Sequence, residues 1–308
     1  MSGRATRSLG RVLLTGARGF LGGATRARLR QEGIDVVGAD IGDGMPGDGI
    51  TACDLRCNDD IVALFASAPF DTVLHCGAVS GPMVLADRPG DIWRINAQGT
   101  AELLEAARRS GAGRIVVCSS VEVYGARRRG VLDESAPPDP PGVYGASKLA
   151  AEAAVIGYAN GEGLDVLALR LGWVYGPGRA TPTMLEALLR AATEGRDFEV
   201  EGHPADVAHY LYIEDAVSGL LAAATAGAVT SRIFNIVGPA GETLGDVADV
   251  VGRLCPQSRI DFERAEPSAE GPDGYTSHRA ADELGFRAHV RLGDGLERTM
   301  RSLATPPA

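Results

Sequence analysis

The chain lacks the features that would place it in a membrane or on an acidic polymer. No apolar run among its 308 residues approaches the roughly 18 residues that cross a bilayer. The net charge of -10 argues against a general nucleic-acid binder or a protein held on anionic lipid. Only Val12-Leu13-Leu14 separate the basic N-terminal segment from a glycine-rich turn, which is too short an apolar run for a signal peptide. We therefore expect neither a nucleic-acid nor a membrane partner.

Cysteine is scarce and does not form a metal or disulfide motif. The five cysteines are an odd number and include no C-x-x-C pair. Cys76 and Cys118 stand in apolar, strand-like runs and are expected to act as small buried hydrophobic side chains. Cys53 and Cys57 lack neighbouring residues that would complete a zinc site. We therefore expect no metal and a reducing, cytoplasmic location.

Lysine is the scarcest residue type, since Lys148 is the one lysine among 30 basic residues. It follows Tyr144 by four positions, so the two side chains would share one face of a helix. A lysine ammonium is more compact than the planar fork of arginine, and near a phenol it should lower the tyrosine pKa from about 10. The alternative is a solvent-facing lysine, but chance would put it here only roughly one time in thirty. We interpret Tyr144 as a general acid/base.

The first two-thirds of the chain alternates short β-branched runs with longer alanine- and leucine-rich stretches. This pattern is typical of a parallel sheet covered by helices, so we predict an α/β fold with a doubly wound sheet. Asp133–Gly142, with four prolines, is expected to be a rigid loop leading to Tyr144. The expected strands are Arg11–Thr15, Asp35–Ala39, Thr72–Cys76, Arg114–Ser119, Asp165–Leu171, Tyr210–Ile213 and Arg232–Val237. The expected helices are Phe20–Gln31, Asp59–Ser67, Pro89–Ser110, Val143–Asn160, Thr183–Thr193, Glu214–Ala224, Thr243–Leu254 and Gly293–Leu303.

A glycine-rich turn follows the first expected strand, with Gly16, Gly19 and Gly22 spaced G-x-x-G-x-x-G. Gly16 allows the tight turn, Gly19 lets the backbone approach a pyrophosphate, and Gly22 permits close helix-on-strand packing. The helix that follows offers free N–H groups to an anion. Asp40, at the end of the next strand, can bind a ribose hydroxyl and repel a 2′-phosphate, which favours NAD over NADP. A purely structural turn is the alternative, and the surrounding strand, helix and acidic residue favour the dinucleotide.

With these residues in place, the chain resembles the extended short-chain dehydrogenase/reductase family, the NAD-dependent epimerase/dehydratase group. The resemblance covers nearly the whole chain. The matching segments are Asp54-Leu55, His75-Cys76-Gly77-Ala78, Asn96 with Gly99-Thr100, Cys118-Ser119-Ser120-Val121-Glu122-Val123-Tyr124-Gly125, Glu134 with Pro137, Pro140 and Tyr144, Arg170 with Val174-Tyr175-Gly176-Pro177-Gly178, Tyr212-Ile213-Glu214-Asp215 and Glu283-Leu284-Gly285-Phe286.

The resemblance implies a Rossmann-type NAD-binding domain, residues 1–171 with about 212–237, interleaved with a smaller C-terminal substrate-binding domain, residues 172–211 with about 238–308. It also implies a homodimer through the helices at Pro89–Ser110 and Val143–Asn160. The implied catalytic residues are Ser120, Tyr144, Lys148 and, as a candidate base, Glu122. NAD would be held by Gly16, Gly19, Phe20, Leu21, Gly22, Asp40, Asp54, Leu55, Cys76, Gly77, Ala78, Asn96, Tyr144 and Lys148. Substrate would contact Ser120, Val121, Trp173 and His209.

Several residues depart from the family pattern where that pattern grips a nucleotide diphosphate. Trp173 replaces an asparagine, and Ala208 and Glu270 stand at arginine positions. One lost charged contact costs roughly 1.5–3 kcal/mol of binding free energy, so these changes favour a smaller polyol, sugar or sugar acid. Val121 replaces the acid of the dehydratase Asp-Glu pair and leaves Glu122 alone, which disfavours that elimination. The alternatives for Glu122 are a role in epimerisation, a role in decarboxylation, or a purely structural role.

Three hypotheses follow for the activity. The leading one is an NAD-dependent oxidoreductase acting at a secondary alcohol or ketone of a carbohydrate-like substrate. The second is a nucleotide-sugar 4-epimerase that retains NAD, and the third is a non-catalytic NAD-binding sensor. The run Arg127-Arg128-Arg129 is either a solvated loop or a mobile lid that reaches an anionic substrate.

Overall fold

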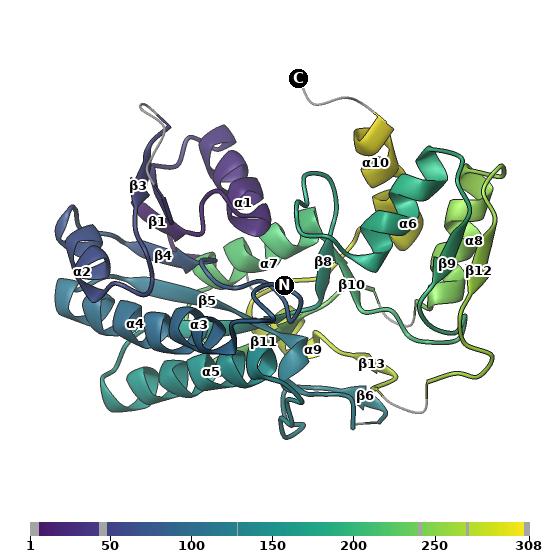
Figure 1. Cartoon of the computed structure of the whole chain (residues 1–308). Helices are drawn as coiled ribbons and strands as arrows, with labels where there is room; N and C mark the ends of the chain where they lie inside the picture. The colour runs from purple at the N-terminus through teal and green to yellow at the C-terminus, as the bar shows by residue number, and fades with distance from the viewer. Residues whose placement is uncertain (1–5, 43–47, 128, 240–241, 269–270, 305–308) are drawn as a thin grey trace.

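The computed structural model describes residues 6–42, 48–127, 129–239, 242–268 and 271–304, so Arg128 and Glu270 lie outside the described residues. Its central feature is a parallel sheet with the strand order β11-β7-β5-β4-β1-β2-β3 (Figure 1). The order runs outward in both directions from β1 and β4, which is the doubly wound arrangement predicted from the sequence. The strands are β1 Val12–Thr15, β2 Val36–Asp40, β3 Ile50–Ala52, β4 Thr72–His75, β5 Arg114–Ser120, β7 Val166–Leu171 and β11 Ile233–Ile236.

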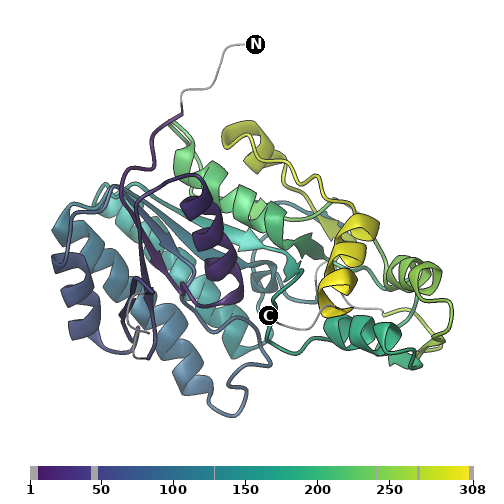
Figure 2. The same ribbon diagram turned by 90° about the horizontal axis from the view of Figure 1, so that it is seen from above.

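Helices cover both faces of this sheet, because successive strand residues point to opposite sides. The helices α1 and α7 lie on one face of the sheet, and α2, α4 and α5 lie on the other (Figure 2). Leu14 belongs to the first of these two apolar layers and Leu13 to the second. The helices are α1 Phe20–Gln31, α2 Asn58–Ala66, α4 Gly99–Ser110, α5 Val143–Gly161 and α7 Ile213–Thr225. None of the helices in the described part of the chain is both long and apolar enough to span a membrane.

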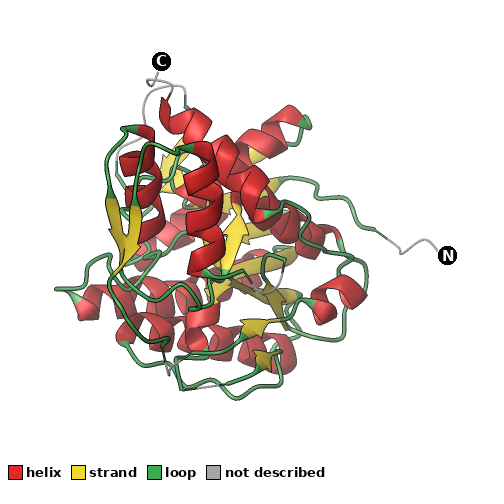
Figure 3. Cartoon of the chain, turned by 90° about the vertical axis from the view of Figure 1, so that its right-hand side faces the viewer, coloured by secondary structure: helices red, strands yellow, loops and turns green. Residues whose placement is uncertain are grey.

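Beyond β7 the chain returns to the sheet with α7 and β11, and most of the rest builds a smaller layer beside it, on the side that faces the viewer in Figure 3. This layer has its own apolar core and consists of β8 Trp173–Tyr175, α6 Met184–Thr193, β9 Phe198–Val200, β10 Tyr210–Tyr212, α8 Leu244–Leu254, β12 Ile260–Phe262 and α10 Leu292–Ala304, with β8 paired to β10 and β9 to β12. A third pair of short parallel strands, β6 Val131–Leu132 and β13 Gly274–Tyr275, lies apart from this core, and α9 His278–Glu283 packs on β11.

The stretch Pro89–Ser110 was predicted as a single α-helix, but its hydrogen-bonding pattern changes along its length. It begins as α3 Pro89–Trp93, loosens into a π-helical segment at Arg94–Gln98 and continues as α4. The other predicted helices and strands of the central sheet are confirmed to within a few residues at each end. β3, β6, β8, β9, β12, β13 and α9 were not predicted, because elements this short carry no readable periodicity.

A buried polar network fastens α5 to the sheet. Arg170 on β7 donates from Nε and Nη2 to the Glu152 carboxylate on α5, at 2.9 and 2.7 Å, and Ser119 Oγ on β5 donates to Glu152 Oε1 at 2.5 Å. The Arg170 and Glu152 side chains are only 6% and 2% exposed. The guanidinium also stacks 4.6 Å from the centroid of the Tyr124 ring. Two strands and one helix therefore depend on a single buried ion pair.

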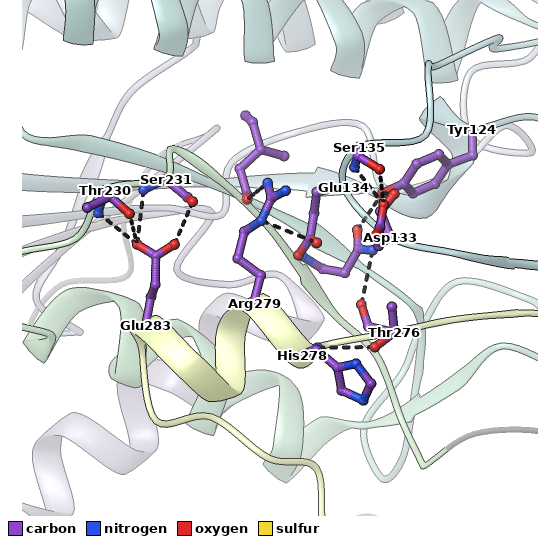
Figure 4. Close-up of polar contacts among 12 residues, drawn as sticks. Tyr124, Asp133, Glu134, Ser135, Thr230, Ser231, Thr276, His278, Arg279 and Glu283 are labelled. Carbon is purple, nitrogen blue, oxygen red and sulfur yellow. Dashed lines mark hydrogen bonds and ion pairs between the residues drawn. The ribbon is translucent and has the colours of Figure 1, made fainter.

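The acidic landmarks Glu134 and Glu283 hold the chain together rather than facing the large cleft. Glu134 accepts the Asn235 N–H of β11 at 2.7 Å and lies 3.5 Å from Arg279 of α9 (Figure 4). Glu283 accepts from the backbone and hydroxyl groups of Thr230 and Ser231, just before β11. Both carboxylates thus dock α9 and the proline-rich loop against the edge strand.

Candidate active site

A cleft of about 1460 Å³ opens at the carboxyl ends of the parallel strands, between the sheet and the smaller layer. In an open α/β sheet this edge is where ligands bind, because the loops after the strands converge there. Apart from Asn96, each residue expected to bind cofactor or substrate or to act in catalysis lines it: Gly16, Gly19, Phe20, Leu21, Gly22, Asp40, Asp54, Leu55, Cys76, Gly77, Ala78, Ser120, Val121, Glu122, Tyr144, Lys148, Trp173 and His209.

The glycine turn at the cleft requires glycine for steric reasons. Gly16 has φ +68°, and a Cβ there would lie 2.7 Å from the Cys76 carbonyl carbon. A Cβ on Gly22 would overlap the carbonyl oxygen of Gly16, so any side chain would displace the turn. Helix α1 begins after Gly19 without a side-chain cap, which leaves its first N–H groups for an anion.

Asp40 is fixed at the end of β2 by the backbone around it. Its carboxylate oxygens accept the N–H groups of Arg18 and Ile41, both at 2.7 Å. A carboxylate offers about four acceptor positions, so Asp40 keeps capacity for ribose hydroxyls. Asp54 differs, because Arg56 binds it at 2.6 Å and this hydrogen bonding lowers the pKa of its carboxyl group.

Asn96 was expected at the cofactor but does not line the cleft, because its side chain is hydrogen-bonded inside the protein. It is 1% exposed; Oδ1 accepts the Val79 N–H at 2.8 Å, and Nδ2 donates to Ser147 Oγ at 3.1 Å. It therefore connects the segment after β4 to α5. His75 plays a similar part, since its ring contacts Thr15 and Thr100 at 2.7 and 3.1 Å, and burial lowers its pKa to about 3.

Ser120, Tyr144 and Lys148 line the same cleft. Ser120 ends β5, and Tyr144 and Lys148 lie one turn apart on α5. Burial raises the pKa of the Tyr144 phenol to about 12, although hydrogen bonding with Ser120 opposes this rise. The predicted lowering of this pKa by Lys148 is wrong for this structure. Lys148 Nζ instead donates to the Cys118 carbonyl at 2.9 Å, and burial lowers the pKa of Lys148 itself.

The two thiols beside Lys148 face each other across neighbouring strands. Cys76 Sγ and Cys118 Sγ are 3.7 Å apart. Hydrogen bonding with Cys118 and burial raise the pKa of Cys76. Cys118 is buried and Cys76 is half-buried, as expected for small apolar side chains at the floor of a cleft.

Two of the expected substrate residues, Trp173 and His209, pack against each other at the wall of the cleft. Trp173 Nε1 donates to Glu122 Oε1 at 3.0 Å, so the indole holds the carboxylate. His209 packs edge-on against Trp173 and Tyr275, with ring centroids 5.3 and 4.5 Å apart. Burial lowers the pKa of His209 to about 4, which leaves the imidazole neutral near pH 7.

The arginine run was expected to be either a solvated loop or a lid, and neither of its two described residues lines the cleft. Arg127 points to solvent, with its side chain 85% exposed, whereas Arg129 donates to the Gly271 carbonyl at 2.8 Å. Ala208 is buried and does not line the cleft. Arg179 and Tyr275 do line it and were not predicted. Arg179 directly follows the Val174–Gly178 motif and could have been found there, whereas nothing local marks Tyr275.

Comparisons with known proteins agree with this geometry. Residues 12–237 match the NAD dependent epimerase/dehydratase family. A dTDP-glucose 4,6-dehydratase of Streptomyces griseus is 32% identical over 213 residues, a match spanning 67% of this chain and 63% of that relative. The structure of MoeE5 in complex with UDP-glucose and NAD is 28% identical, with a TM-score of 0.82, and covers 96% of this chain and 99% of that one. A UDP-glucose 4-epimerase of Thermotoga maritima shares the fold at 21% identity, with a TM-score of 0.86, over 96% of this chain and 98% of that one.

Proposed function

Because the chain belongs to the NAD-dependent epimerase/dehydratase family, we propose that it transfers a hydride at a secondary alcohol or ketone of a sugar or sugar-acid-like substrate. The observation that carries this proposal is the meeting of Ser120, Tyr144 and Lys148 in a cleft that also contains the glycine turn. A proton-transfer group beside a dinucleotide site is the arrangement that alcohol oxidation requires.

NAD is the cofactor that suits this cleft. Gly19, Phe20 and Leu21 would bind the pyrophosphate at the start of α1, and Asp40 would accept the adenosine ribose hydroxyls. The 2′-phosphate of NADP is negatively charged and would be repelled by the Asp40 carboxylate, which disfavours NADP. In this proposal residues 1–171 with about 212–237 bind the cofactor, and residues 172–211 with about 238–308 bind the substrate.

When bound, NAD would supply the hydride acceptor. Tyr144, as its phenolate, would take the proton of the substrate hydroxyl, and the Ser120 hydroxyl would donate a hydrogen bond to the substrate oxygen. Lys148 has three N–H donors, of which one is used by Cys118, so the others can hold the nicotinamide ribose. Its positive charge also stabilises the phenolate once the site is filled.

A second candidate is a nucleotide-sugar 4-epimerase that keeps its NAD. The resemblance to MoeE5, whose structure contains UDP-glucose and NAD, favours it. The tryptophan at position 173 and the alanine at position 208 disfavour it, because neither supplies a charge for a diphosphate. A non-catalytic NAD sensor ranks last, since nothing in the catalytic set has been lost.

The amount of NAD that stays bound through purification distinguishes these candidates. We expect protein purified without added NAD to release well under one NAD per chain on denaturation, because a dehydrogenase exchanges its cofactor each cycle. Added NAD and a panel of sugars and sugar acids should then yield NADH, measured by its absorbance. Near-stoichiometric NAD that survives purification would contradict this expectation and favour the epimerase.

We also propose a homodimer built on the helical stretch Pro89–Ser110, which contains α3 and α4, and on α5, against which both of these helices pack. Trp93, Val143 and Ile156 on these helices are 45%, 40% and 43% exposed. Exposed apolar surface is unfavourable in water, and a partner subunit would cover it. We expect light scattering to give twice the chain mass and Ile156→Glu to give the monomer mass. A monomer in the unmodified protein would contradict the proposal.

A further inference from the structure

Two cysteine thiols lie together where the strands β4 and β5 open into the cleft. Cys76 Sγ and Cys118 Sγ are 3.7 Å apart, and both residues line the cleft. His75 of β4 lies opposite Val117 of β5, so Cys76 and Cys118 are the next residues on each strand and face each other. Neighbouring strands are about 4.8 Å apart, which lies within the roughly 4.4–6.8 Å Cα separation that a disulfide spans. The backbone therefore already suits a bond between these two sulfur atoms.

The charge of Lys148 lies beside this pair. Its Nζ donates to the Cys118 carbonyl at 2.9 Å. Hydrogen bonding with Cys76 lowers the pKa of the Cys118 thiol, and the positive charge of Lys148 acts in the same direction. The thiolate is the form that oxidants attack, so a thiol beside a fixed ammonium in an open cleft is well placed to be oxidised. A second thiol within contact distance can then resolve the oxidised sulfur as a disulfide.

We propose that Cys76 and Cys118 are a reversible redox site, in which a peroxide joins the two thiols in a disulfide and so weakens cofactor binding. The Cys118 thiolate attacks one oxygen of hydrogen peroxide and the O–O bond breaks. A sulfenic acid forms, and the departing hydroxide takes up the proton that the thiol released. The Cys76 thiol then attacks this sulfur, the S–O bond breaks, and its proton leaves with the hydroxyl as water. The two thiols thus lose two electrons and two protons, and the peroxide becomes two molecules of water.

The backbone of Cys76 transmits this change to the glycine turn. Cys118 is held within β5, which pairs with β7 as well as with β4, whereas Cys76 lies just beyond the end of β4. Shortening the distance between the sulfur atoms from 3.7 Å to about 2 Å should therefore move Cys76. The turn packs directly on it, since a Cβ on Gly16 would lie 2.7 Å from the Cys76 carbonyl carbon. The next residue, Gly77, also donates its N–H to Thr15 Oγ1 at 3.1 Å.

The effect on the cofactor is reciprocal. This part of the inference rests on the proposed function, since it assumes that the glycine turn binds NAD. If the disulfide weakens NAD binding, bound NAD must oppose the disulfide by the same factor. A tenfold loss of affinity corresponds to a shift of about 30 mV in the potential of this two-electron couple when NAD saturates the protein. In a reducing compartment the disulfide would reopen once the peroxide is consumed.

Peptide mass and calorimetry test this proposal on the unaltered protein, without requiring a substrate or turnover. The protein is treated with hydrogen peroxide, the excess is removed with catalase, and one portion is digested without reductant. We expect a cross-linked peptide that joins Cys76 to Cys118 and that dithiothreitol separates. Isothermal titration with NAD should show binding at least about tenfold weaker to the oxidised protein, with the full affinity restored by dithiothreitol. Saturating NAD during the peroxide treatment should reduce the yield of the cross-linked peptide.

Two variants separate this disulfide from other oxidation. Cys118→Ala should form no cross-link and should keep its NAD affinity after peroxide, because the backbone carbonyl that binds Lys148 remains. Cys53→Ala is the matched control, since Cys53 lines the same cleft but packs in the apolar layer with Ile61 of α2. It should form the cross-link and lose NAD affinity as the unaltered protein does.

Three results would overturn the redox site. They are the absence of a Cys76–Cys118 peptide, equal NAD affinity in the reduced and the cross-linked protein, and an equal loss of NAD affinity to peroxide in Cys118→Ala. Reduced protein that binds no NAD would instead refute the proposed function, and this is seen before any peroxide is added. Should a variant not fold, the peptide and the NAD titrations of the unaltered protein decide the question.

Discussion

Replacing Tyr144 by phenylalanine is expected to lower the turnover rate by about 10²–10⁴-fold while NAD binds as before. The substitution removes one oxygen, the atom that hydrogen-bonds with Ser120, and leaves the ring packed against Val79 and Ile92. Affinity for NAD should persist because the glycine turn and Asp40 lie elsewhere in the cleft. Turnover measured as NADH formation, with NAD affinity measured separately by titration, checks both parts.

Tyr158→Phe is the matched control, because Tyr158 lies on the same helix but its hydroxyl contacts the surface residue Glu105 at 3.3 Å. The pH dependence adds a second test. Since burial raises the pKa of Tyr144 to about 12, the fraction of phenolate, and with it the oxidation rate, should rise with pH through the alkaline range. Unchanged turnover in Tyr144→Phe, or a rate that falls as pH rises, would remove Tyr144 from the mechanism.

Replacing Glu152 by glutamine is expected to lower the free energy of unfolding by about 3–5 kcal/mol. The Arg170 guanidinium would then be buried without its counter-ion, and Ser119 would lose a charged acceptor. The cost should be large because both partners are almost completely buried. Urea unfolding followed by circular dichroism measures it as a shift of the midpoint.

Glu194→Gln provides the comparison, because Glu194 pairs with Arg196 on the surface, where both side chains are about half exposed or more. Its unfolding midpoint should barely move. The double variant Glu152→Leu with Arg170→Met should recover part of the lost stability, since it removes both charges together. A loss in Glu152→Gln no greater than in Glu194→Gln would mean that the buried pair does not fasten α5.

The parts of the fold that follow local rules were predictable from the sequence. The strands of the central sheet other than β3 were found because buried parallel strands form short continuous apolar runs, and α1 was found because its glycine turn and its length are both visible. Asp40 could be placed for the same reason, since it ends a recognisable strand, whereas Ser120 was placed by the family resemblance. Tyr144 and Lys148 needed only the spacing of a helix.

The rest depended on contacts between residues distant in sequence. Asn96 was expected at the cofactor, but its amide is taken up by Val79 and Ser147, which no spacing rule reveals. The direction of the Lys148 ammonium was equally hidden, because its acceptor is a backbone carbonyl on β5. β8 and β9 are three residues long, and only their pairing with β10 and β12 defines them as strands.

Three remote stretches of chain, represented by Trp173, His209 and Tyr275, meet through ring contacts at the wall of the cleft. A substitution in any one of these stretches can change the shape of the same wall. Substrate choice can therefore change through three separate parts of the sequence. None of them is the glycine turn or α5. A laboratory evolution experiment that randomises these stretches separately could therefore redirect the enzyme to new sugars while its chemical step is inherited intact.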